Sequence, residues 1–110
     1  MSYFAVFREA GPSWEPDRAI TEQPDVNEHA AFINRLADEG FVLIAGPLGE
    51  GESGHLRVLL IVDASSAVEI AERLAGDPWV TTGRIRLLSI EPWSVLVGDG
   101  RLAGLGTAQL

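Results

Sequence analysis

The sequence predicts an α+β domain of the ferredoxin-like type, with the order βαββαβ and a four-stranded antiparallel sheet that carries two helices on one face. Three observations lead to this prediction. The chain has 110 residues, of which 46% are hydrophobic, and this suits one compact domain. Four short apolar runs are interleaved with two segments of helical periodicity. The second and third runs are separated only by a glycine-rich loop, which is typical of a hairpin.

Each predicted strand is a run of apolar and β-branched residues. The four runs are residues 3–7, 41–46, 56–62 and 85–91. An acidic segment rich in proline and glycine follows the first run and indicates a long loop before the first helix.

The first helix is predicted over residues 26–39. Its apolar side chains recur every three or four positions, at Val26, Ala30, Ile33 and Ala37. Asp25 stands in the N-cap position, and Gly40 is placed to end the helix. The helix therefore has one apolar stripe, which we expect to face the sheet.

The second helix is predicted from its capping signal. Ser66 and Glu69 have the spacing of a capping box, and Gly76 is placed to end the helix. A short helical turn then begins, with Asp77 at the N-cap and Pro78 at the first helical position.

The predicted strands are apolar on both faces. In the second strand, Val42 and Ile44 point to one face and Leu43 to the other. Because two helices cover only one face, we expect a second copy of the chain to cover the other, in a face-to-face homodimer. In the alternative, the tail of residues 94–110 folds back over the open face, with 95–97 as a fifth strand. The tail is short and glycine-rich, which favours the dimer.

Composition excludes several classes of function. Sixteen acidic residues against eight basic ones give a formal net charge of -8, so we expect no nucleic-acid partner. All the basic residues are arginine, which excludes a Schiff-base lysine, and the absence of cysteine excludes a thiolate nucleophile. Without a signal peptide or a long apolar segment, we expect a cytoplasmic protein with no membrane association.

His29 is the first candidate for chemistry. It lies three residues after Val26 and four before Ile33, on the edge of the apolar stripe of the first helix. One interpretation is a boundary histidine whose ring binds a backbone carbonyl. The other is a general base or acid in a pocket, because the ordinary pKa of imidazole lies nearest neutral pH.

Asp77 also has two interpretations. Followed by Pro78, it has the sequence of a simple helix start. In this fold, however, a residue of the first helix and one after the second can approach each other. A carboxylate bound to one ring nitrogen of His29 would fix the tautomer and leave the other nitrogen free to accept a proton.

Two other patterns do not predict a ligand site. Gly49, Gly51 and Gly54 have the spacing G-x-G-x-x-G, but a strand follows where dinucleotide binding needs a helix. His29 and His55 lack the spacing of a metal site such as H-E-x-x-H. We therefore expect neither a cofactor nor a metal.

Three short motifs occur together with the inward-facing histidine. They are Ala45-Gly46-Pro47 after the second strand, Gly76-Asp77-Pro78-Trp79 after the second helix, and Glu91-Pro92-Trp93 at the end of the fourth strand. On these motifs the chain resembles the YCII (YciI-like) family over residues 3–97. The resemblance implies a dimeric α+β barrel domain over residues 1–97, followed by a glycine-rich C-terminal extension, residues 98–110.

The resemblance also implies an active site. It assigns the catalytic pair to His29 and Asp77 and places Gly46 and Pro47 at the pocket rim. Of the aromatic residues, which suit core or dimer packing, we expect Trp79 and Phe4 to contribute to substrate binding.

The function that these expectations favour is a small cofactor-independent enzyme. The His-Asp pair would transfer a proton on a small aromatic or keto-acid-like metabolite, in lyase, dehydrochlorinase or isomerase chemistry. One alternative is a non-catalytic small-molecule-binding or accessory protein that uses the same barrel pocket. Another is a cofactor-free oxygenase of the dimeric α+β barrel type.

Overall fold

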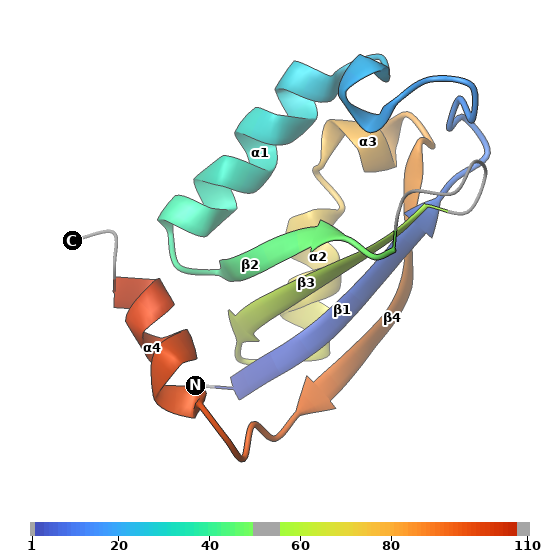
Figure 1. The fold of residues 1–110 in the computed structure, drawn as a ribbon. Helices are drawn as coiled ribbons and strands as arrows, with labels where there is room; N and C mark the ends of the chain where they lie inside the picture. The colour runs from blue at the N-terminus through green and yellow to red at the C-terminus, as the bar shows by residue number, and fades with distance from the viewer. Residues whose placement is uncertain (1, 50–55, 108–110) are drawn as a thin grey trace.

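The computed structural model describes residues 2–49 and 56–107 and has the predicted order of elements (Figure 1). The elements are β1 (Ser2–Ala10), the 3-10 turn η1 (Ile20–Glu22), α1 (Val26–Asp38), β2 (Val42–Pro47), β3 (Arg57–Ala64), α2 (Ala67–Leu74), α3 (Pro78–Thr81), β4 (Ile85–Trp93) and α4 (Asp99–Thr107). The expected βαββαβ succession is therefore confirmed, α3 is the short helical turn predicted after Asp77, and η1 and α4 are elements that were not predicted.

The four strands form one antiparallel sheet in the order β2-β3-β1-β4. This is the ferredoxin-like order, in which the first and third strands are central. Leu36 of α1 and Ile70 of α2 belong to the same buried cluster as Val6 of β1. Both long helices thus cover one face of the sheet, as predicted.

Alternation along β1 decides which side chains enter this core. Phe4 and Val6 point to the helix-covered face and are 7% and 0% exposed. Arg8 occupies the next position on the same face and is only 2% exposed. A charged side chain is therefore built into the buried layer at the end of the strand.

The start of α1 differs from its prediction. Asp25 occupies the N-cap position, but its side chain makes no capping hydrogen bond. Its φ is 62°, in the left-handed region, where a short polar residue costs less than a bulky one. The helix ends at Asp38, one residue before the predicted end, and Gly40 follows with φ 79°.

The start of α2 follows its prediction more closely. Ser66 Oγ accepts a hydrogen bond from the Glu69 amide at 3.1 Å. The Glu69 carboxylate accepts from the amide and the hydroxyl of Ser65, at 2.8 and 3.0 Å, rather than from the Ser66 amide. These bonds lower the pKa of Glu69.

The C-terminal tail contains a helix. Residues 95–97 do not form the fifth strand that the alternative arrangement required, and Leu96 is 90% exposed. The glycines of the extension lie within or beside α4, which contacts β2. Each glycine costs a helix about 1 kcal/mol without forbidding it. Figure 1 shows α4 at the end of the molecule away from α3.

The sheet face opposite α1 and α2 keeps exposed apolar side chains. Ile44 of β2 pairs with Ile61 of β3 and is 57% exposed. It does not share a face with Val42 as predicted, because the register shifts between Val42 and Ile44, and Val42 lies in the core. Trp93 of β4 pairs with Tyr3 of β1 and is 43% exposed. A hollow of about 270 Å³ at the β2–β3 edge is lined mainly by apolar side chains.

Within residues 2–49 and 56–107, the structure has no helix long and apolar enough to cross a membrane.

Candidate active site

Asp77 is the centre of a buried polar cluster. It is 0% exposed and caps α3, with Oδ1 accepting a hydrogen bond from the Trp79 amide at 2.9 Å. Oδ2 accepts a hydrogen bond from Arg8 Nη2 at 2.5 Å. His29 Nδ1 lies 2.8 and 2.9 Å from the two carboxylate oxygens. One side chain thus joins β1, α1 and the start of α3.

His29 and Asp77 are in contact in the structure, as expected. Because a carboxylate only accepts hydrogen bonds, the Nδ1 atom of His29 carries the hydrogen and donates it to Asp77. In the neutral ring, Nε2 then has a free lone pair. The His29 side chain is 19% exposed, so it is the member of the pair that a ligand reaches.

Trp79 fixes the plane of the imidazole ring. The two rings stack with centroids 3.9 Å apart and an angle of 7° between their planes. Trp79 is 1% exposed, and its indole Nε1 donates to the Pro24 carbonyl at 2.8 Å. Trp14 packs edge-on against it at 5.5 Å. The ring of His29 is therefore held from one side by stacking and at Nδ1 by a carboxylate.

Arg8 is the member of the cluster that the sequence analysis missed. Burial lowers the pKa of its guanidinium, while the charge of Asp77 acts in the opposite direction. The group stays protonated, as arginine does in proteins. The signal was present in the sequence, because Phe4, Val6 and Arg8 occupy alternate positions and so share one face of a strand.

A cavity of about 180 Å³ adjoins this cluster. Its polar wall consists of His29 and Arg8, and the ring of Trp79 closes one side. Gly46 and Pro47 of β2 also line it, and the other lining residues are aliphatic. Asp77 itself lies behind His29 and is not part of the wall.

Phe4, which we expected to contribute to substrate binding, does not line this cavity. It belongs to the core between the sheet and the long helices, together with Leu36 and Val62.

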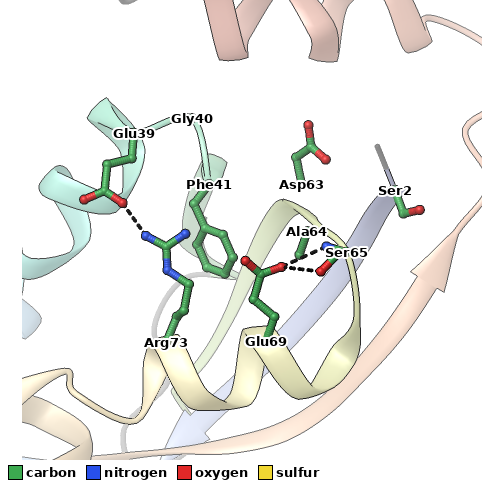
Figure 2. Close-up of a pocket in the computed structure, with 9 residues that line it drawn as sticks. All are labelled: Ser2, Glu39, Gly40, Phe41, Asp63, Ala64, Ser65, Glu69 and Arg73. Carbon is green, nitrogen blue, oxygen red and sulfur yellow. Dashed lines mark hydrogen bonds and ion pairs between the residues drawn. The ribbon is translucent and has the colours of Figure 1, made fainter.

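A larger hollow, of about 380 Å³, lies between the end of α1 and the start of α2 (Figure 2). Four of its polar side chains already have partners within the fold. Arg73 pairs with Glu39 and lies over the ring of Phe41 at 4.2 Å, while Glu69 binds Ser65. It contains none of the residues of the Asp77 cluster, and we place the candidate site at the smaller cavity.

In the described ranges, 2–49 and 56–107, no three His, Cys, Asp or Glu side chains are grouped so that they could hold a metal ion.

Comparison with known proteins gives a family match and a structural match. The family model of the YCII-related domain matches residues 3–94. A search of curated proteins found no match. Among solved structures, the chain is similar to 5-chloro-2-hydroxyhydroquinone dehydrochlorinase (TftG) from Burkholderia phenoliruptrix AC1100, in complex with 2,5-dihydroxybenzoquinone. The TM-score is 0.53 at 17% identity, with 89% of this chain and 97% of the other covered. At this identity the likeness concerns the fold.

Proposed function

The chain belongs to the YCII-related domain family, and we propose that it is a small enzyme in which His29 transfers a proton on a single-ring or keto-acid-sized molecule. The observation that carries this proposal is the bond between His29 Nδ1 and the fully buried Asp77, at the wall of a cavity. It leaves Nε2 as the basic atom of the ring.

The arrangement suits reactions that begin with proton abstraction. Nε2 of His29 takes a proton from a carbon or a hydroxyl group of the substrate, and the positive charge that forms on the ring is stabilised by the Asp77 carboxylate. In an elimination from a chlorinated hydroxyhydroquinone, the imidazolium returns the hydroxyl proton to the carbon that carries chlorine, which gives a ketone tautomer. Loss of the proton of the para hydroxyl then forms the second carbonyl, and chloride departs with its bonding pair. In an isomerisation, the imidazolium returns the proton to a different carbon. Each step uses only groups of the chain itself.

The size of the cavity supports a small substrate. Its volume of about 180 Å³ is close to that of a protein cavity that holds benzene, about 150 Å³. The solved structure of TftG contains 2,5-dihydroxybenzoquinone, a single substituted ring, and that enzyme acts on a chlorinated hydroxyhydroquinone. We therefore propose hydroxylated six-membered rings as the first substrate class to test.

The exposed apolar side chains of the open sheet face support a second part of the proposal, the homodimer. Ile44 and Trp93 lie on this face, and the adjoining hollow is apolar. A second copy that packs its own open face there would remove these side chains from water.

The experiment that tests the proton-transfer role is chloride release from 5-chloro-2-hydroxyhydroquinone, followed for the wild type and for His29→Asn. We expect slow but measurable release by the wild type and a loss of at least a hundredfold in His29→Asn. Ser66→Ala is the control, because it removes the cap of α2 away from the site and should leave the rate unchanged.

Two results would contradict the proposal. Equal rates for the wild type and His29→Asn would exclude this histidine as the proton acceptor. Binding of a panel of ring compounds with no reaction of any of them would favour the alternative of a binding or accessory protein.

A further inference from the structure

We propose that Arg8 is the anion-binding group of the cavity and that the ligand is a planar molecule with an ionised oxygen, such as a phenolate or an enolate. This inference rests on the proposed function, because it concerns the same cavity. It adds the charge and chemical class of the ligand.

The first observation is the unfilled hydrogen-bonding capacity of Arg8. A guanidinium has five N–H donors, and among the described residues the structure pairs Nη2 with Asp77 while buried Nε has no partner. The side chain is 2% exposed and lines the cavity. Buried donors are satisfied in most proteins, so a ligand oxygen in this cavity is a fitting partner.

The second observation is the charge of the wall. Among the described residues, those that line the cavity include one permanent cation, Arg8, and no carboxylate, although the chain as a whole has a formal net charge of -8. The single negative charge of Asp77 balances Arg8 while His29 is neutral. When His29 takes a proton, the three groups together have one net positive charge. A ligand that has just become an anion neutralises it.

The third observation is that Asp77 has other hydrogen-bond partners besides Arg8. Asp77 already accepts hydrogen bonds from the Trp79 amide and from His29. A buried arginine is therefore not needed to hold the carboxylate in place, and its burial carries a desolvation cost. Electrostatic stabilisation of an anion formed during the reaction would offset this desolvation cost.

The test uses two probes of the same shape. Para-nitrophenol ionises to a yellow phenolate, whereas para-nitrotoluene has a methyl group in place of the hydroxyl. For the wild type we expect the phenolate to bind at least tenfold more tightly than para-nitrotoluene, which is the effect of a hydrogen bond to a charged group. Near neutral pH, binding should also raise the yellow fraction. An unchanged or lower yellow fraction would overturn the proposal without any variant.

The variants then assign the effect to one residue. Arg8→Gln should lower the affinity for the phenolate about tenfold or more and change that for para-nitrotoluene little. Arg84→Gln is the matched control, because Arg84 also has a buried Nε without a partner in the described structure but lies outside the cavity. Equal loss for both probes, or equal loss in the control, would overturn the role of Arg8.

Two further variants keep the test decisive. If Arg8→Gln does not fold, Arg8→Lys keeps the charge, and we expect it to retain the preference for the phenolate at reduced affinity. If the Arg8→Lys protein bound the phenolate no more tightly than para-nitrotoluene, the proposal would be overturned. His29→Asn should still raise the yellow fraction, because Arg8 remains, and loss of the rise would assign it to His29 instead.

These results separate the two proposals. Phenolate binding that depends on Arg8, in a protein that turns over no ring compound, supports this inference and contradicts the catalytic one. If the protein turns over a ring compound and Arg8→Gln leaves the phenolate affinity unchanged, the catalytic proposal is supported and this inference is contradicted.

Discussion

Asp77 combines a structural and a functional position in one carboxylate. The same Oδ1 atom that caps α3 through the Trp79 amide also faces the His29 ring. The hydrogen bond from the Trp79 amide holds the Asp77 carboxylate against the first turn of the helix. The histidine partner is therefore as well positioned as the helix itself.

The contact with Arg8 makes Asp77→Asn a severe change. Asparagine is as good an N-cap as aspartate, so a residue that only caps would lose little stability. Here the substitution leaves a buried guanidinium without its counter-charge, and breaking a buried pair costs about 3–5 kcal/mol. We expect a fall of this size in the free energy of unfolding, measured by urea denaturation.

The control for this prediction is Ser66→Ala, which removes a cap that has no ionic partner. We expect it to cost about 1 kcal/mol. Asp77→Asn with a cost no larger than that of the control would show that the Arg8 contact contributes nothing to stability.

At the scale of elements, the loop after β1 meets the turn before β4 at very close range. The Gly11 amide donates to the Arg84 carbonyl at 2.8 Å, and the Ser13 amide donates to the Gly83 carbonyl at 2.9 Å. A Cβ atom at Gly11 would lie 2.3 Å from the Gly83 carbonyl oxygen. The contact fixes the end of the strand that carries Arg8 against the segment that follows α3.

Gly11→Ala should therefore displace backbone rather than a flexible side chain. We expect it to lower the free energy of unfolding by about 1–3 kcal/mol, as overpacking does. Gly100→Ala is the comparison, because nothing lies within 4 Å of its added Cβ in α4. It should be neutral or stabilising by up to about 1 kcal/mol. Thermal unfolding of both variants decides the point, and equal melting temperatures would contradict it.

The elements were predictable where local signals determine them. Ser66 with Glu69 predicted the start of α2, and Gly40 marked the end of α1 to within one residue. The helix α4 was not predicted, because the glycines of the tail outweighed the helix-forming residues between them. Asp25 was expected to cap with its side chain, but its left-handed backbone removes that geometry.

The site was partly predictable for a different reason. His29 and Asp77 are 48 residues apart, so their contact depends on where α1 and α3 lie on the sheet. The order of elements made an approach possible without fixing a distance. Arg8 was missed because a charged residue near the end of an apolar run was not considered for the core. Because alternate residues of a strand share one face, Arg8 lies on the same buried face as Phe4 and Val6.

At the scale of the whole molecule, we predict a homodimer formed through the open sheet face. Light scattering at micromolar concentration should give twice the chain mass of 11.8 kDa. Ile44→Glu places a charge at a side chain that is 57% exposed in the single chain, so the monomer should still fold. The same change at Val68, which is 66% exposed on α2, is the control.

Under this prediction the Ile44 variant is monomeric and the Val68 variant remains a dimer. A wild-type mass near 11.8 kDa at every concentration would mean that the open face is not an interface.

The central claim is that Asp77 holds His29 with Nδ1 protonated and Nε2 available as a base. Nitrogen-15 NMR of the histidine-labelled protein tests it most directly, because protonated and unprotonated ring nitrogens have well-separated chemical shifts. At a pH where the ring is neutral, we predict that His29 has the hydrogen on Nδ1, and that Asp77→Asn weakens this preference. A neutral His29 with its hydrogen on Nε2 in the wild type would contradict the account.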